Sequence, residues 1–144
     1  MAEYRKTEVL KQYSPVNEGV IDRLLNEEIN KSQTKFVVLD DDPTGIQTVH
    51  DISVFTDWSK ASMRKGFIDE NRLFYILTNS RSMTPEQTRQ VHEEIARTAE
   101  EISRELNQKY VLISRSDSTL RGNYPLETNV LKEVMEKQGG HSDF

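Results

Sequence analysis

The chain has 144 residues, 24 of them acidic and 19 basic, so its formal net charge of -5 provides no basic field for nucleic acid or for a membrane surface. It has no cysteine, which excludes disulfides, thiolate catalysis and cysteine-bound zinc, and no apolar stretch approaches the ~18 residues that cross a bilayer. Because residues 1–6 are not followed by the apolar core of a signal peptide, we expect a cytoplasmic protein.

The first predicted element is an amphipathic helix over about residues 15–31. Ser14-Pro15 is typical of a helix start, and five apolar residues then recur at helical spacing. These residues are Val20, Ile21, Leu24, Leu25 and Ile29. We expect residues 1–34 to form a helical extension that packs on the domain that follows, residues 35–144.

From residue 35 onward, predicted strands alternate with predicted helices. The strands are expected at Phe36–Leu39, Ile52–Thr56, Leu73–Leu77 and Tyr110–Ile113. The helices are expected at Ser59–Phe67, from Thr84 to about Asn107, and from Pro125 to Gly139-Gly140. Thr84 and Gln87 have the spacing of a capping box. This alternation predicts an α/β fold with a mostly parallel, Rossmann-like three-layer sheet, covered by helices on both faces.

Polar clusters follow three of the four predicted strands. They are Asp40-Asp41-Asp42-Pro43-Thr44-Gly45, Thr78-Asn79-Ser80-Arg81-Ser82, and the segment Ser114–Gly122, which reads Ser-Arg-Ser-Asp-Ser-Thr-Leu-Arg-Gly. The carboxyl ends of parallel strands lie along one edge of a sheet, where open α/β sheets bind ligands. The sequence therefore predicts that the three clusters meet in one binding site.

The residue types in these clusters indicate the chemistry of the ligand. Three adjacent carboxylates repel one another, so we expect a cation, an arginine or a polyhydroxylated ligand beside them; the alternative is a solvated acidic turn. Arg81, Arg115 and Arg121 could each be ordinary surface residues, but together they suit a carboxylate or a phosphate. We expect aspartates to accept from ligand hydroxyls and arginines to hold a carboxylate. The three histidines are scattered, so no metal site is expected.

Three strings together resemble the N-terminal, sugar-binding domain of the four-carbon acid sugar kinase family. They are Asp41-Asp42-Pro43-Thr44-Gly45, Thr78-Asn79-Ser80-Arg81 and the most specific one, Asp117-Ser118-Thr119-Leu120-Arg121-Gly122-Asn123. The resemblance covers about residues 35–144 and implies ATP-dependent phosphorylation of a four-carbon sugar acid such as threonate or erythronate. It implies substrate contacts from Asp41, Asp42, Arg81, Asp117, Ser118, Thr119 and Arg121. The clustering of arginines adds Arg115 to this set.

The chain departs from the family pattern in two residues and in extent. Arg115 stands where a lysine is expected before the third string, and Asn79 stands where an aspartate is common. No glycine-rich phosphate loop occurs, so we expect ATP and Mg²⁺ to bind to a C-terminal nucleotide-binding domain that is absent from this chain. The chain alone is then expected to be inactive. In the intact kinase, we expect Asp42 to orient or deprotonate the attacking hydroxyl.

Two other functions remain open at this point. The pattern Asp40-x-Asp42-x-Thr44 after an apolar strand resembles the first motif of haloacid-dehalogenase-like phosphatases, with Asp40 as nucleophile, Asp42 as general acid and Thr78 as the second motif. That magnesium-dependent function requires a later acidic pair that the chain lacks, and it leaves Ser114–Gly122 unexplained. A non-catalytic module that binds a sugar acid is the other alternative. The sequence does not decide the oligomeric state, and a homo-oligomer is compatible with it.

Overall fold

The computed structural model describes residues 17–116 and 122–139. The chain divides into two compact units, Met1–Ser32 and Gln33–Phe144. In the first unit, the predicted helix is confirmed as α2 (Glu18–Lys31), which begins after Asn17 because the Asn17 side chain accepts from the backbone N–H of Val20 at 3.2 Å. None of its residues is buried, and the five apolar residues of its stripe are 40–55% exposed.

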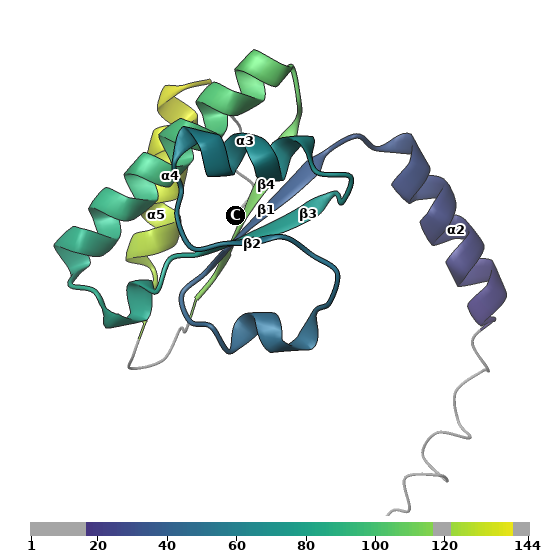
Figure 1. The fold of residues 1–144 in the computed structure, drawn as a ribbon, viewed down its shortest axis with the longest axis horizontal. Helices are drawn as coiled ribbons and strands as arrows, with labels where there is room; N and C mark the ends of the chain where they lie inside the picture. Colours follow the sequence, from purple (N-terminus) through teal and green to yellow (C-terminus); the bar gives the residue numbers. More distant parts are fainter. Residues whose placement is uncertain (1–16, 117–121, 140–144) are drawn as a thin grey trace, which may run out of the picture. The chain divides into compact units, whose positions relative to one another are not determined.

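The second unit is built on a four-stranded sheet in the order β2-β3-β1-β4 (Figure 1). Its strands are β1 (Lys35–Asp40), β2 (Val54–Phe55), β3 (Leu73–Leu77) and β4 (Tyr110–Arg115). All three neighbouring pairs are parallel. The predicted α/β fold with a mostly parallel sheet is therefore confirmed, although β2 is shorter than the strand expected at Ile52–Thr56.

The predicted helices of this unit are also confirmed. They are α3 (Lys60–Ile68), α4 (Pro85–Leu106) and α5 (Leu126–Lys137), and two short 3₁₀ helices follow strands, η1 (Gly45–Thr48) and η2 (Ser80–Ser82). The capping box of α4 forms as expected: Thr84 Oγ1 accepts from the N–H of Gln87 at 3.3 Å, and Gln87 Oε1 accepts from the N–H of Thr84 at 3.0 Å. The helix ends at Asn107, which is left-handed at φ 50°.

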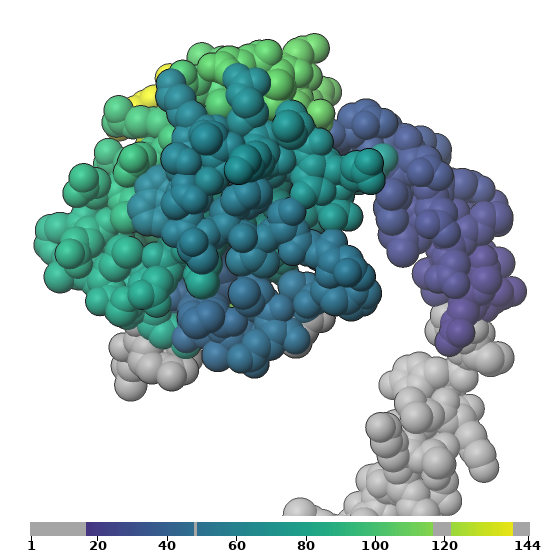
Figure 2. Space-filling model, in the orientation of Figure 1, coloured from purple at the N-terminus to yellow at the C-terminus, as the bar shows by residue number. Residues whose placement is uncertain are grey.

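One face of the sheet carries the hydrophobic core. Val37 and Leu39 of β1 pair in register with Phe74 and Ile76 of β3, and all four side chains pack with α3, α4 and α5 in a single cluster. These helices group on one side of the strands in Figure 1. In the space-filling view of Figure 2, which has the same orientation, the side chains of α3 cover this side of the strands. Burial of these apolar side chains is the main favourable contribution to the fold.

The opposite face of the sheet is less covered. Phe36, Val111 and Ile113 point to this face and are 37%, 42% and 41% exposed, whereas Val38 between them is buried. The second helical layer expected from the continuous apolar run of β1 is thus not formed by α3, α4 or α5. Within the described residues of this unit, η1 lies on this side of the sheet, at the carboxyl ends of the strands.

Candidate functional site

The three polar clusters begin at neighbouring positions on one edge of the sheet. Because β1 lies between β3 and β4, Asp40 at its carboxyl end is paired in register with Leu77 on one side and Arg115 on the other. We call this edge the carboxyl rim: residues 40–45, 78–82 and 114–116. The expected substrate contacts Asp117, Ser118, Thr119 and Arg121 lie outside the described residues.

Arg81 binds two of the three adjacent carboxylates. Its Nε and Nη2 donate to the two oxygens of Asp41 at 3.2 and 3.0 Å, and its Nη1 donates to Asp42 Oδ2 at 2.8 Å. Asp41 is only 3% exposed, so this two-bond contact supplies the positive charge that a buried carboxylate requires. Of the three neighbours expected for the acidic cluster, the arginine is the one that the structure places there.

Asp42 also shapes the loop that follows β1. Its Oδ1 accepts from the N–H of Thr44 at 2.6 Å and from the hydroxyl of the same residue, while Oδ2 accepts from Arg81. Both carboxylate oxygens of Asp42 therefore have protein donors.

Asp40 forms a second ion pair at the rim, with Arg115. The Nη1 of Arg115 donates to both oxygens of Asp40, at 3.0 and 3.3 Å. Asp40 is fully buried, and this burial raises its pKa, while the Arg115 guanidinium opposes the rise. A Cβ at Gly45 would overlap both Arg115 and Asp40, so the glycine allows η1 to close over the pair. Asp40 is thus not accessible as a nucleophile, which argues against the phosphatase alternative.

A group of four buried polar residues lies behind the rim, and sequence reasoning identified only Ser80 among them. Ser80, Thr88, His92 and Glu127 are each no more than 1% exposed. They come from η2, α4 and α5. The available signal was the position of Glu127 three and four residues before Val130 and Leu131, which places a carboxylate on the apolar face of α5.

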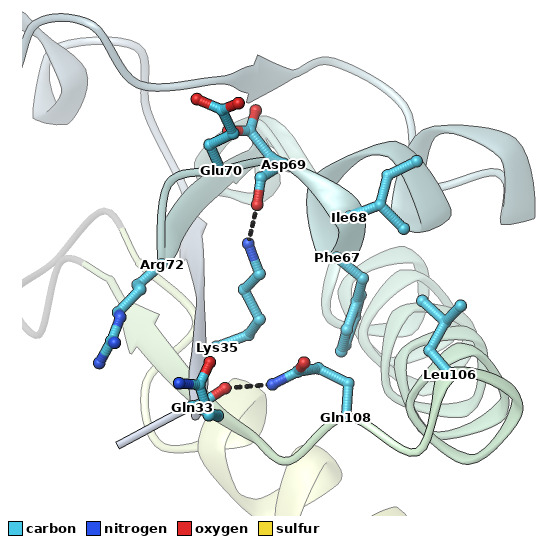
Figure 3. Close-up of a pocket in the computed structure, with 9 residues that line it drawn as sticks. All are labelled: Gln33, Lys35, Phe67, Ile68, Asp69, Glu70, Arg72, Leu106 and Gln108. Carbon is cyan, nitrogen blue, oxygen red and sulfur yellow. Dashed lines mark hydrogen bonds between the residues drawn. The ribbon is translucent and has the colours of Figure 1, made fainter. Parts of the chain in front are cut away.

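A separate pocket of about 450 Å³ lies at the other end of the strands (Figure 3). It is lined by Gln33, Lys35, Phe67, Ile68, Asp69, Glu70, Arg72, Leu106 and Gln108. Lys35 donates through Nζ to the backbone carbonyls of Asp69 and Asn71, and burial lowers its pKa. We call it the amino-edge pocket; of the predicted site residues that the structure describes, none lines it.

Within residues 17–116 and 122–139, no group of three or more His, Asp or Glu side chains is arranged to hold a metal ion. Guanidinium groups bind the three aspartates that a cation would otherwise neutralise. In the same residues, no helix has the length and apolar character needed to cross a membrane.

Comparison with known proteins gives one match. A family model described as the sugar-binding N-terminal domain matches residues 36–141, the stretch that carries the sheet, its helices and the rim. No curated protein and no solved structure matches the chain. The family model covers well over half of the chain and agrees with the resemblance seen in its three strings. The chain therefore belongs to the family of sugar-binding N-terminal domains.

Proposed function

We propose that this chain is the substrate-binding half of an ATP-dependent kinase that phosphorylates a four-carbon sugar acid such as erythronate or threonate. The observation that carries the proposal is the convergence of acidic and arginine residues from separate strand ends at one rim, in a chain of the sugar-binding family. The carboxyl ends of parallel strands are the usual ligand site of such sheets. Aspartates that accept from hydroxyls, beside arginines, suit a polyhydroxy carboxylate.

Within this proposal, the arginines have different roles. Arg81 organises the site, because its guanidinium already binds Asp41 and Asp42. Arg115 is a better candidate for the ligand carboxylate: its side chain is 51% exposed, and only its Nη1 bonds to Asp40 among the described residues. Arg121, which lies outside the described residues, is the second candidate.

Asp42 is the residue that we propose orients the attacking hydroxyl. It is 20% exposed at the rim, whereas Asp41 and Asp40 are buried. An ordinary aspartate is a weak base near neutral pH, so its contribution is to hold the hydroxyl in position rather than to remove its proton in advance. ATP and Mg²⁺ would be bound by a nucleotide-binding domain, since no glycine-rich phosphate loop occurs in this chain.

A thermal-shift panel tests the ligand class. Erythronate or threonate at concentrations well above Kd should raise the melting temperature, because a ligand that binds only the folded state stabilises it. ATP alone should leave the melting temperature unchanged. Stabilisation by ATP without stabilisation by any four-carbon sugar acid would contradict the proposal.

Titration of variants tests the residues. Arg121→Ala should weaken erythronate binding by about one to two orders of magnitude, since one charge-assisted contact is worth roughly 1.5–3 kcal/mol. Arg97→Ala is the matched control, because Arg97 lies on α4 with a 67% exposed side chain. Equal effects at the two positions would remove Arg121 from the site.

Activity is tested with a protein that also contains the nucleotide-binding domain. There, Asp42→Asn should lower kcat strongly, and the 144-residue chain alone should not phosphorylate erythronate, because phosphoryl transfer requires a positioned nucleotide. Binding of erythronate without any turnover by the two-domain protein would support the non-catalytic module instead.

A further inference from the structure

The buried residue Glu127 holds the short helix η2 from behind. Ser80, the first residue of η2, donates its hydroxyl to Glu127 Oε1 at 2.6 Å. Glu127 comes from α5, 47 residues later in the chain, and it is 1% exposed. Breaking a hydrogen bond between buried groups leaves a donor and an acceptor unsatisfied, so this contact connects the two elements firmly.

Other contacts fix the same serine. Asn123, shortly before α5, donates through Nδ2 to the carbonyl of Ser80 at 3.1 Å and to Thr88 Oγ1 at 3.0 Å. Thr78 Oγ1 lies 3.1 Å from Ser80 Oγ and 3.0 Å from the carbonyl oxygen of Asp40. Ser80 is therefore held by α5, by the segment before α5 and by the end of β3.

The residue after Ser80 is Arg81, which binds Asp41 and Asp42. Asn79, on the other side of Ser80, is left-handed at φ 55°, so the chain turns sharply into η2. The direction of the Arg81 guanidinium thus depends on where Ser80 is held. We propose that Glu127 is a positioning residue of the carboxyl rim: through Ser80 it places Arg81 so that this arginine holds Asp41 and Asp42 in the geometry that accepts the ligand.

The surroundings of Glu127 support a positioning role over simple packing. Its Oε2 is buried without a hydrogen-bond partner among the described residues. Its nearest cationic candidate is His92, whose Nε2 lies 3.9 Å from Oε1, and burial lowers the pKa of His92. A buried carboxylate with one open oxygen is a poor way to stabilise a fold, because an apolar side chain of similar size avoids the desolvation cost.

The first experiment needs no ligand. The ¹⁵N–¹H signal of Arg81 Nε, assigned by its loss in Arg81→Ala, reports whether the guanidinium is held by Asp41. In Glu127→Met the acceptor for Ser80 is removed while side-chain length is kept, and the signal should move to the position of exposed arginines. In Glu127→Gln the amide oxygen still accepts from Ser80, so the signal should stay at its wild-type position.

Ser80→Ala provides the second variant in case Glu127→Met does not fold. It removes the donor of the same contact with a smaller change in volume, and it should also displace the Arg81 signal. A wild-type Arg81 signal in folded Ser80→Ala, or in folded Glu127→Met, overturns the proposal.

The second experiment concerns affinity, and this part rests on the proposed function. Glu127→Met should weaken erythronate binding about tenfold or more, and should cause no further loss in an Arg81→Ala background, because both changes remove the same contact. Independent, additive losses would overturn the positioning role. If the wild-type protein does not bind erythronate while the Arg81 signal responds as expected, the proposed function fails and the positioning role stands.

Discussion

The two ends of the sheet differ in what their polar side chains bind. At the carboxyl rim, side chains from separate segments bind one another: Arg81 binds Asp41 and Asp42, and Arg115 binds Asp40. At the amino edge, Lys35 and Gln108 bind the backbone, although Asp69 also accepts from the Ser53 hydroxyl at 2.5 Å. Lys35 donates to carbonyls of the turn after α3, and Gln108 donates to the carbonyl of Gln33 (Figure 3).

This difference shows why the amino-edge pocket is not the better candidate for the ligand site. The amino-edge pocket has a volume of about 450 Å³. Its buried lysine, Lys35, donates to backbone carbonyls in the turn that follows α3. Lysines near a helix C-terminus commonly satisfy free carbonyls in this way, so this contact stabilises the turn. At the rim, by contrast, charged groups from the ends of three strands lie together. The folding of any one turn does not require this arrangement. The chemistry of the bonded partners therefore distinguishes the two ends of the sheet.

The largest loss of stability is expected from breaking the ion pair between Arg81 and Asp41 at the rim. Arg81→Ala leaves Asp41 buried without its guanidinium, which should lower the free energy of unfolding by roughly 3 kcal/mol, at the low end for a broken buried pair. Urea unfolding measures this loss, and Asp41→Asn in the same chain should restore part of it. If Arg81→Ala is no more destabilising than Arg97→Ala, the charges at the rim are not coupled.

A smaller effect is expected at the amino edge. Lys35→Met keeps the length of the side chain but removes two hydrogen bonds to carbonyls, and it should destabilise the protein by about 2 kcal/mol. Erythronate affinity, measured by calorimetry, should not change. A large loss of affinity in Lys35→Met would place the ligand at the amino edge instead of the carboxyl rim.

The glycine of η1 provides a third test. In Gly45→Ala the new Cβ overlaps Arg115 and Asp40, so the Arg115 side chain must shift and weaken the ion pair. Overpacking of this kind costs roughly 1–3 kcal/mol, and the exposed Arg115 side chain can yield but the buried Asp40 cannot, so we expect about 2 kcal/mol by urea unfolding. An unchanged midpoint would show that η1 does not close over the pair. Gly19→Ala on α2 is the control, since a Cβ there has room.

The smallest effect concerns pH and the network behind the rim. Burial lowers the pKa of His92 in the folded state below its ordinary value near 6.5. As the pH falls through 6.5, the unfolded state binds a proton that the folded state does not, so stability is lost with decreasing pH. His92→Gln should flatten this dependence between about pH 7.5 and 5.5 in thermal unfolding. Equal slopes in wild type and His92→Gln would contradict the assignment.

Much of the fold was predictable because periodicity and capping act locally. The apolar stripe of α4 and its Thr84–Gln87 capping box were visible in the sequence, and parallel pairing then brought the ends of β1, β3 and β4 to one edge. The covering of the sheet was not predictable in this way. Val37, Val38 and Leu39 of the central strand β1 are all buried, although α3, α4 and α5 cover only one face of the sheet. A continuous apolar run therefore does not show that helices cover both faces of a sheet.

The site was predictable in composition but less so in its pairings. Arginines were expected both beside the adjacent carboxylates and on a ligand carboxylate, and Arg81 binds the protein's own Asp41 and Asp42. Sequence alone cannot distinguish these uses, because the pairing depends on the direction of side chains from different strands. Glu127 was hidden for another reason: one carboxylate on the apolar face of a helix is a small interruption of the pattern, and its partner Ser80 lies 47 residues away.

The partly bare face of the sheet has a consequence for handling the protein. Among the described strands, β4 is at an edge, and Val111 and Ile113 point outward from it beside Phe36. An edge strand with exposed β-branched residues can pair with the same strand of another molecule, the first step of ordered aggregation. Arg115 ends this strand with a charge that Asp40 holds in place, and such a charge at the end of an apolar segment opposes stacking. Neutralising that arginine to probe ligand binding therefore also removes a protection against precipitation.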